Sequence, residues 1–351
     1  MFSIPKTMRT VSFIDHLPIE DPSSLLDTTV DVPTVTGHDL LVRVEAVSVN
    51  PADSGSRSNR QFFEAMSTQN KHKILGYDGA GVVVAVGSDV SLFKVGDEVY
   101  YAGSLVREGS NAEYQAVDER IVGHKPKSLN FADAASLPLT AITAYEALFH
   151  RLEIPEKTPI PSNKSVLILN GAGGVGSIAI QLLKALTDLT VIATASRPQS
   201  SAWVKELGAD HVVNHAEDIP KQLAAIGFSQ VDYILINTFI EPYFDAIVDL
   251  LKPQGKVCSI MPAVDNLPFQ KLFFKSVSFH WECMFTRSLY TTDDIVEQHR
   301  LLNHVSELVD TKRVRSTASE SLGKINAENL KKAHAAIESR RTVGKMVLTG
   351  F

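Results

Sequence analysis

Short apolar and β-branched runs, separated by Gly, Asp, Asn and Pro, dominate the first third of the chain. They predict strands at 7–13, 39–49, 79–87, 97–103 and 112–123. The segment at 131–149 instead carries Ala and Leu at helical spacing, interrupted by Pro138. The pattern therefore predicts a mostly β region that ends in a helical bridge.

Apolar strands alternate with helices after a proline-rich connector at 153–164. Strands are expected at 165–170, 190–195, 211–215, 231–237, 255–261 and 275–284, with helices at 177–186, 202–209 and 243–251. Strands that are apolar on both faces and separated by helices predict a parallel sheet covered on each side, the doubly wound α/β arrangement. Two amphipathic helices, 292–308 and 326–339, then precede a strand at 344–350.

Composition and charge narrow the class of partner. The 351 residues are 44% apolar and 21% charged, as in ordinary globular proteins, and carry a net charge of −6. No block of like charges offers the basic face that binds nucleic acid, and no stretch approaches the roughly 18 apolar residues of a membrane span. Cys258 and Cys283 show no CxxC spacing, which argues against a disulfide framework. We expect a cytoplasmic protein that binds a small molecule, and neither nucleic acid nor membrane.

A glycine-rich turn lies between the first strand of the alternating region and the helix that follows it. Gly171, Gly173 and Gly176 match the G-x-G-x-x-G pattern. The first glycine permits the tight turn, the second lets a pyrophosphate approach the backbone, and the third lets helix pack on strand. The helix start at Gly174 and Val175 offers N–H groups to the anion. The turn predicts a dinucleotide site; the alternative is a turn that only connects strand and helix.

The end of the next strand indicates which dinucleotide binds. An acid about twenty residues beyond the glycines would bond a free 2′-hydroxyl, but Ser196 and Arg197 stand there. A hydroxyl and a guanidinium suit a 2′-phosphate, because arginine pairs with phosphate through a planar fork. NADPH is therefore the expected cofactor, with an ordinary solvated Arg197 as the alternative.

The order of these parts resembles that of the medium-chain dehydrogenase/reductase superfamily. Two segments add to the resemblance, SVNPADSGSR at 48–57 and LGYDGAGVVVAVGSDVSLFKVGDEVY at 75–100. Within it, the chain is most similar to the branch of quinone oxidoreductases and zinc-type alcohol dehydrogenase-like proteins. The resemblance covers essentially the whole chain. It implies a GroES-like, mostly β catalytic domain at 1–138, completed by 290–351, and a Rossmann domain at 139–289. It also implies a cleft between them where nicotinamide meets substrate.

The resemblance assigns three further residues to the cofactor. Thr143 matches a threonine that reaches it, and Asn237 lies where a strand end meets it. Lys345 belongs to a stretch similar to the superfamily's closing strand and is expected near the cofactor phosphates. The alternatives are that Thr143 and Asn237 are capping residues and that Lys345 is a surface lysine.

Zinc-dependent members of the superfamily hold the metal with a cysteine early in the β domain, a histidine in a G-H-E motif and a third ligand beside the helical bridge. Here the resemblance places Asn50 first, GYD at 76–78 second, and Leu139 with Thr140 third. The closely spaced cysteines of a structural zinc lobe are also missing, and the scattered histidines, among them His215, show no metal spacing. Tetrahedral zinc takes nitrogen or thiolate ligands, so the sequence predicts no bound metal.

Without a metal, hydride transfer needs neutral hydrogen-bond donors and a proton source near the developing negative charge. The resemblance places Asn50 beside the nicotinamide as the main catalytic candidate, with Asp53 bracing its loop. Tyr77 either donates a proton or packs in the wall of the cleft. The tyrosine that often follows N-P-x-D in this branch is missing from SNRQFFEAM at 58–66, so water is the other expected proton source.

Together these patterns favour an NADPH-dependent, zinc-independent reductase of a quinone or an α,β-unsaturated carbonyl compound, because their reduced anions are far less basic than an alkoxide. The alternatives are an NADP-dependent alcohol or carbonyl dehydrogenase and a non-catalytic NADPH-binding sensor. The strand at 275–284 resembles the one that joins Rossmann sheets edge to edge in this branch, which predicts a homodimer.

Overall fold

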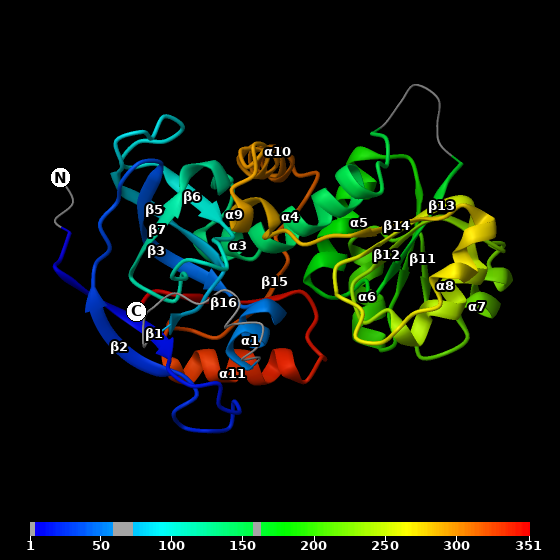
Figure 1. Ribbon diagram of the computed structural model, residues 1–351, viewed down its shortest axis with the longest axis horizontal. Coiled ribbons are helices and arrows are strands. Elements are labelled where there is room, and N and C mark those ends of the chain that lie inside the picture. The colour runs from blue at the N-terminus through cyan, green and yellow to red at the C-terminus, as the bar shows by residue number, and fades with distance from the viewer. Residues whose placement is uncertain (1–3, 59–72, 157–162) are drawn as a thin grey trace. The chain divides into compact units, whose positions relative to one another are not determined.

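The computed structural model describes residues 4–58, 73–156 and 163–351, and its chain divides into two compact units (Figure 1). The first unit comprises Met1–Leu139, Phe285–Lys312 and Ser316–Phe351, and the second comprises Thr140–Met284 and Arg313–Arg315. The short return of Arg313–Arg315 to the second unit has a local cause, since the Arg315 N–H donates to Gln181 Oε1 at 2.8 Å.

Mostly antiparallel strands build the first unit. A three-stranded sheet has the order β2–β1–β4, and a seven-stranded sheet runs β15–β16–β3–β5–β6–β8 with β7 also paired to β3. The bounds are β1 Thr7–Phe13, β2 Leu26–Asp31, β3 Asp39–Ser48, β4 Lys73–Ile74, β5 Asp78–Val86, β6 Glu98–Tyr101, β7 Tyr114–Asp118, β8 Val122–His124, β15 Ala318–Ser321 and β16 Lys345–Thr349. Val347 of β16 lies opposite Ser48 of β3. The last strand therefore runs beside the one that leads to Asn50.

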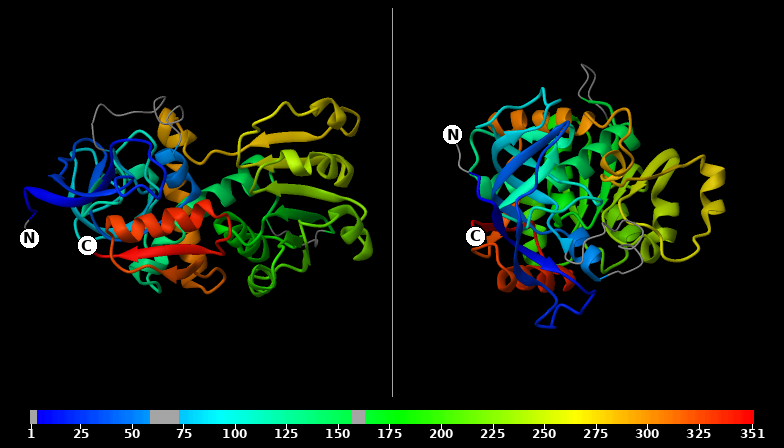
Figure 2. Two further views of the ribbon diagram at one scale, coloured as in Figure 1. Left: turned by 90° about the horizontal axis from the view of Figure 1, so that it is seen from below. Right: turned by 60° about the vertical axis from the view of Figure 1, so that its left-hand side comes forward.

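Helices pack against the seven-stranded sheet and connect its strands. They are α1 Pro51–Ser58, η1 Glu119–Ile121, α3 Phe131–Ala135, α9 Thr286–Tyr290, α10 Glu297–Asp310 and α11 Ala327–Glu338. Helix α11 lies along β16 (Figure 2), where Leu330 and Ala333 share a buried core with Met346 and Leu348. Helices α4 Pro138–Tyr145 and η2 Glu146–Arg151 form the predicted bridge.

Helix α10 begins later than the predicted start at 292. The carboxylate of Asp294 accepts hydrogen bonds from the Thr292 hydroxyl at 2.7 Å and from the Arg287 guanidinium at 2.8 Å. These bonds hold the segment in turns, so the helix starts at Glu297.

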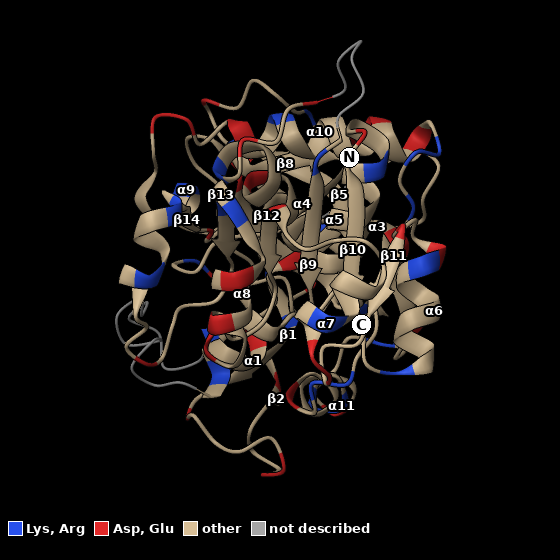
Figure 3. Ribbon diagram, turned by 90° about the vertical axis from the view of Figure 1, so that its right-hand side faces the viewer, with Lys and Arg blue, Asp and Glu red and all other residues tan. Residues whose placement is uncertain are grey.

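The second unit is a six-stranded parallel sheet of order β11–β10–β9–β12–β13–β14, seen strand by strand in Figure 3. The strands are β9 Ser165–Leu169, β10 Thr190–Thr194, β11 His211–Val213, β12 Val231–Ile236, β13 Leu251–Ser259 and β14 Ser278–Trp281. The helices are α5 Gly174–Leu186, α6 Pro198–Glu206, α7 Ile219–Ala225, η3 Glu241–Tyr243, α8 Phe244–Leu250 and η4 Phe269–Lys275. This sheet confirms the predicted doubly wound α/β class, because its central strands are buried on both faces.

Acidic and basic residues are interspersed along the helices of the second unit (Figure 3). In the part of the chain that the structure describes, no helix combines the length and apolar character that crossing a bilayer requires.

Candidate active site

A buried polar cluster forms in the first unit where β3, β5 and β16 begin or end. Asn50 and Asp78 are 0% exposed and Lys345 is 4% exposed. The Lys345 ammonium donates to the Asp78 carboxylate at 2.9 Å, to the Val49 carbonyl at 3.0 Å and to Asn50 Oδ1. Asn50 Nδ2 in turn donates to Asp78 at 2.8 Å. The surface-lysine alternative for Lys345 is therefore wrong, because the pairing of β16 with β3 carries its side chain inward.

Three chain positions that the resemblance links to zinc meet in this cluster. The other oxygen of the Asp78 carboxylate accepts the backbone N–H of Leu139 at 2.7 Å. Through these hydrogen bonds Asp78, which belongs to the segment at 76–78, is connected both to Asn50 and to Leu139. The cation held among them is the ammonium of Lys345, whose charge is balanced by Asp78.

Asp53 braces the loop between β3 and α1. One carboxylate oxygen accepts the N–H of Asn50 at 2.7 Å, and the other accepts those of Gly76 and Tyr77 at 3.2 Å. Burial raises the pKa of Asp53 from 3.8 to about 7, although these N–H donors and Lys345 oppose the rise. Because the pKa is higher in the folded state, the ionised carboxylate destabilises the fold increasingly as pH rises from about 4 to 7.

Tyr77 lies inside the first unit with its hydroxyl held in place. The hydroxyl shares a hydrogen bond of 2.7 Å with Ser56 Oγ, and the ring packs at 4.7 Å from the ring of Phe285. Burial raises the pKa of Tyr77, so the phenol stays protonated at neutral pH and is a hydrogen-bond donor. The stretch at 58–66, where the tyrosine of this branch is missing, lies outside the described residues from 59 onward.

Helix α1, which carries Ser56, is anchored to α11 by a buried arginine that the sequence did not single out. The Arg57 guanidinium donates to Glu338 Oε1 and to the Leu17 carbonyl, and Ser54 Oγ donates to Glu338 at 2.7 Å. Burial lowers the pKa of the adjacent His334 to about 3, with the Arg57 charge adding to the effect. His334 is therefore neutral, and Glu338 is the counterion of Arg57.

The glycine turn joins β9 to α5 in the second unit. A Cβ on Gly176 would lie 2.5 Å from the Gly171 carbonyl oxygen, and a Cβ on Gly171 would lie 2.9 Å from Ala193 Cβ. Both glycines are thus required by the packing of the turn itself. A Cβ on Gly173 would come no closer than 3.6 Å to any other protein atom, that atom being Asn170 Nδ2. This is an ordinary van der Waals distance, so the packing of the turn does not require a glycine at this position, whereas the close approach of a pyrophosphate would.

The turn lies at the point where the strand order of the sheet reverses, since β10 and β12 flank β9 on opposite sides. Among the described residues no side chain caps α5, so its first N–H groups, at Gly174 and Val175, are available to an anion. Asn237 follows β12 at the same edge, its N–H donating to the Leu169 carbonyl at 3.3 Å. Both polar atoms of the Asn237 side chain are buried without a hydrogen-bond partner in the described part of the chain. A bound dinucleotide would satisfy them.

The other cofactor candidates lie in different surroundings. Thr143 is buried within α4 rather than at a helix end. Ser196 is exposed just after β10, and Arg197 starts α6, its N–H donating to Ser200 Oγ at 3.2 Å. The loop with Ser196 and Arg197 thus lies at the carboxyl edge of the sheet, and its contact with a 2′-phosphate stays a prediction.

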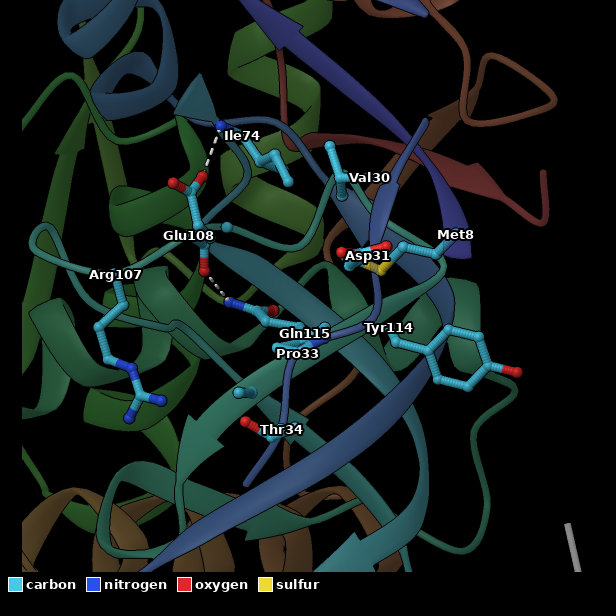
Figure 4. Close-up of a pocket in the computed structure, with 12 residues that line it drawn as sticks. Met8, Val30, Asp31, Pro33, Thr34, Ile74, Arg107, Glu108, Tyr114 and Gln115 are labelled. Atoms are coloured by element: carbon cyan, nitrogen blue, oxygen red, sulfur yellow. Dashed lines mark hydrogen bonds between the residues drawn. The ribbon is translucent and has the colours of Figure 1, made fainter. Parts of the chain in front are cut away.

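A cavity of about 560 Å³ opens elsewhere in the first unit, and its lining includes none of the predicted site residues (Figure 4). Its wall is held by the Ile74 N–H bond to Glu108 at 2.7 Å and the Gln115 amide bond to the Glu108 carbonyl at 3.0 Å. The same wall continues to Ser110, whose hydroxyl donates to the Asp78 carbonyl at 2.7 Å. The segment at 108–110 therefore lines the cavity and also supports the polar cluster, but the cavity itself is not part of that cluster.

Comparisons with known proteins agree with this architecture. Residues 36–127 match the alcohol dehydrogenase GroES-like domain, and residues 174–298 match the zinc-binding dehydrogenase family. A zinc-type alcohol dehydrogenase-like protein of Staphylococcus aureus (strain MSSA476) is 39% identical over 90% of this chain and 92% of its own. An NADPH-dependent alkenal/one oxidoreductase of Arabidopsis thaliana is 35% identical over 75% of this chain and 64% of its own.

Solved structures extend the likeness over the whole chain. A protein of Rhizobium etli CFN 42, described as a candidate zinc-dependent alcohol dehydrogenase, is 48% identical with a TM-score of 0.92 and 98% coverage of both chains. The quinone oxidoreductase of Coxiella burnetii is 27% identical with a TM-score of 0.80, covering 98% of this chain and 99% of that one.

The zinc in several of these descriptions does not fit the residues present here. The ligand positions offer the amide of Asn50, the phenol of Tyr77 or carboxylate of Asp78, and, at the third position, the backbone of Leu139 or the hydroxyl of Thr140. Tetrahedral zinc sites use thiolate, imidazole and carboxylate donors, and within 4–58, 73–156 and 163–351 no three His, Cys, Asp or Glu side chains are grouped to hold a metal. The single carboxylate is already bonded to an ammonium and two N–H groups.

Proposed function

Because the chain belongs to the medium-chain dehydrogenase/reductase superfamily, we propose that it is a zinc-independent, NADPH-dependent reductase of quinones or α,β-unsaturated carbonyl compounds. The observation that carries this proposal is the cluster of Asn50, Asp78 and Lys345. It fills the positions that would hold zinc with an ion pair whose hydrogen bonds are satisfied internally. A site without a metal favours a reaction that forms a weakly basic enolate or hydroquinone anion over one that forms an alkoxide, which a metal would have to stabilise.

The bound cofactor would supply the hydride, and the protein's own groups divide the remaining work. The N–H groups at the start of α5 bind the pyrophosphate, and the lack of a side chain at Gly173 lets it approach the backbone. Ser196 and Arg197 take the 2′-phosphate, and the unsatisfied amide of Asn237 bonds the dinucleotide at the reversal of the strand order. Thr143 remains a proposed cofactor contact.

In the first unit, the proposed proton donor is Tyr77, and Asn50 is a positioning residue. Both ends of the Asn50 amide are engaged by Lys345 and Asp78, so it holds the cluster rather than presenting a donor of its own. The Lys345 donors are used in the same way, which favours a supporting role over contact with the cofactor phosphates. The Arabidopsis and Coxiella relatives support the choice of alkenals, enones and quinones as substrates.

Stopped-flow absorbance at the nicotinamide band, with a panel of quinones, enones and aldehydes, tests the proposal. We expect oxidation of NADPH by a quinone or an enone, product saturated at the C=C bond for enones, and no stoichiometric zinc in the purified protein by elemental analysis. If aldehydes are reduced at C=O and neither quinones nor enones oxidise NADPH, the result would favour the alcohol or carbonyl dehydrogenase. Tight NADPH binding without oxidation across the panel would favour the sensor.

The variant Tyr77→Phe separates a proton donor from a packing residue. The ring and its contact with Phe285 are kept, so the fold and NADPH affinity are expected to stay unchanged. Loss of a general acid lowers kcat by about a hundredfold or more. Removing its partner in Ser56→Ala leaves the phenol in place and is expected to cost less than Tyr77→Phe. An unchanged kcat in Tyr77→Phe would assign the proton to water.

We also propose a homodimer that forms through the edge strand β14. Beside this strand, η4 carries Phe273 at 75% exposure and Phe274 at 94% exposure, and Trp281 at the end of β14 is 46% exposed. An open sheet edge with exposed aromatic side chains favours pairing with a second copy. Sedimentation velocity should show a dimer that Phe274→Ser weakens. Tyr290→Ser, at an exposed site of the first unit, should leave the dimer intact. A monomeric wild type would contradict the proposal.

We also propose a cytoplasmic location for the protein.

A further inference from the structure

The residue that precedes the glycine turn has a backbone conformation that side chains rarely adopt. Asn170 follows β9 directly and has a φ of 58°, in the left-handed region. Glycine enters this region without steric cost, and asparagine is one of the few other residues that tolerate it. Glycine alone would supply the shape of the turn, so the presence of a side chain at Asn170 needs a further reason.

The Asn170 side chain connects the turn to the strand on one side of β9. Its Nδ2 donates to the Asn237 carbonyl at 3.3 Å. On the other side of β9, the Asn170 N–H donates to the Thr194 hydroxyl at 2.8 Å. Thr194 ends β10 and Asn237 follows β12, the two strands that flank β9. Asn170 is therefore bonded to both strand ends at the reversal of the strand order, the place where open α/β sheets bind their ligands.

The main chain of Asn237 is held by two consecutive residues at the end of β9. Its N–H donates to the Leu169 carbonyl at 3.3 Å, which continues the parallel pairing of β9 with β12 one residue past Ile236. Its carbonyl accepts the Asn170 amide. The first bond belongs to the sheet, whereas the second depends on the Asn170 side chain.

The carboxamide of Asn237 limits the chemistry of what it can bind. Nδ2 and Oδ1 are both buried, and neither has a hydrogen-bond partner among the described residues. Phosphate oxygens accept hydrogen bonds but do not donate them at neutral pH, so a pyrophosphate would satisfy Nδ2 and leave Oδ1 unpaired. A ribose hydroxyl and the carboxamide of nicotinamide both donate and accept. A group of this kind satisfies both ends of the Asn237 amide.

We propose that Asn170 is a positioning residue for the cofactor, which fixes the main chain of Asn237 so that its carboxamide pairs with a ribose hydroxyl or the nicotinamide carboxamide of the bound dinucleotide. The inference rests on the proposed function, because it requires a dinucleotide at the glycine turn. An amide that is held in place before the ligand arrives loses less conformational entropy when it binds. Removal of the Asn170 side chain therefore weakens cofactor binding, although that side chain need not touch the cofactor.

Asn170→Gly removes the side chain and keeps the backbone, because glycine adopts the left-handed conformation freely. Relief of the strained backbone offsets the greater freedom of glycine in the unfolded chain, so the melting temperature of the apo protein should stay within about 2 °C of wild type. Isothermal titration calorimetry is expected to show NADP⁺ binding about three- to tenfold weaker.

Gln254→Gly is the matched control for this substitution. Gln254 is exposed and has a φ of 64°, and it lies near the start of β13, whereas Asn237 follows the end of the parallel strand β12. The two positions are thus at opposite edges of one sheet. Gln254→Gly should leave the affinity for NADP⁺ unchanged.

A double-mutant cycle shows whether Asn170 acts through Asn237. Asn237→Ala is expected to weaken NADP⁺ binding about 5- to 150-fold, since two hydrogen bonds to the ligand are lost. Asn170→Gly added to Asn237→Ala should then cause no further loss. Additive losses would mean that Asn170 only braces the turn, and they would overturn the inference, as would normal affinity in Asn170→Gly.

The fragment 2′-phospho-ADP-ribose, which lacks nicotinamide, identifies the group that Asn237 binds. If Asn237→Ala weakens binding of this fragment as much as that of NADP⁺, the partner is a ribose hydroxyl. If it weakens NADP⁺ alone, the partner is the nicotinamide carboxamide. Unchanged NADP⁺ affinity in Asn237→Ala overturns the inference, but the proposed function stands if the wild type still oxidises NADPH with a quinone or an enone. A wild type that binds neither NADP⁺ nor NAD⁺ overturns both.

Discussion

Replacing Lys345 with methionine is expected to lower the free energy of unfolding of the first unit by about 3–5 kcal/mol, since it leaves a buried carboxylate without its counterion. Methionine fills similar space, so the loss reports charge and hydrogen bonding at Asp78 and Asn50 rather than a cavity. Both tryptophans, Trp203 and Trp281, lie in the second unit, and their fluorescence does not report this change. Amide hydrogen exchange in β3, β5 and β16 does.

A second substitution tests whether the cost is electrostatic. In Lys345→Met with Asp78→Asn the uncompensated charge is gone, and the new amide can still accept the Leu139 N–H and donate to Asn50. The double variant is therefore expected to be more stable than the single variant, with a coupling of at least about 1 kcal/mol. Lys332→Met, which removes an exposed ion pair of α11, should stay within about 0.5 kcal/mol of wild type. Additive costs in the cycle would contradict the ion-pair account.

Gly173→Ala and Gly176→Ala are expected to fail in different ways. The first places its Cβ at an ordinary van der Waals distance of 3.6 Å from Asn170 Nδ2, so the fold is kept while the pyrophosphate is pushed away. A steric penalty of about 1–3 kcal/mol corresponds to a loss of NADPH affinity of about 5- to 150-fold. The second drives its Cβ into the backbone of Gly171 and should lower the melting temperature even without cofactor.

Fluorescence titration of NADPH and thermal denaturation of the apo protein separate these two outcomes. Normal NADPH affinity in a folded Gly173→Ala protein would mean that the turn only connects β9 to α5. A Gly176→Ala protein with unchanged melting temperature would mean that the strand and helix can shift apart at little cost.

The second unit was predictable because its signals are local. An apolar run such as 165–170 predicts a strand without reference to other segments, and the glycines that follow it predict the turn. Helix α1 is not predictable in this way, although it lies in the SVNPADSGSR motif, because its Pro, Asp, Ser and Gly residues show no apolar period. It forms because Pro51 suits the first helical position and Asp53 accepts the Asn50 N–H.

The polar cluster depends on pairs that are far apart in sequence. Lys345 and Asp78 are 267 positions apart, and only the register of β16 against β3 brings them together. One sequence signal was available: a lysine that opens an otherwise apolar strand requires a counterion if the strand is buried.

The distance along the chain between Asp78 and its lysine also has a consequence for biosynthesis. At about 5–20 residues per second, translation brings Lys345 out tens of seconds after Asp78. Apart from Arg313–Arg315, the second unit is continuous and complete well before that moment. On the ribosome the second unit can therefore fold first, while the nascent first unit still exposes Asp78 without its counterion and the edge of β3 that later pairs with β16.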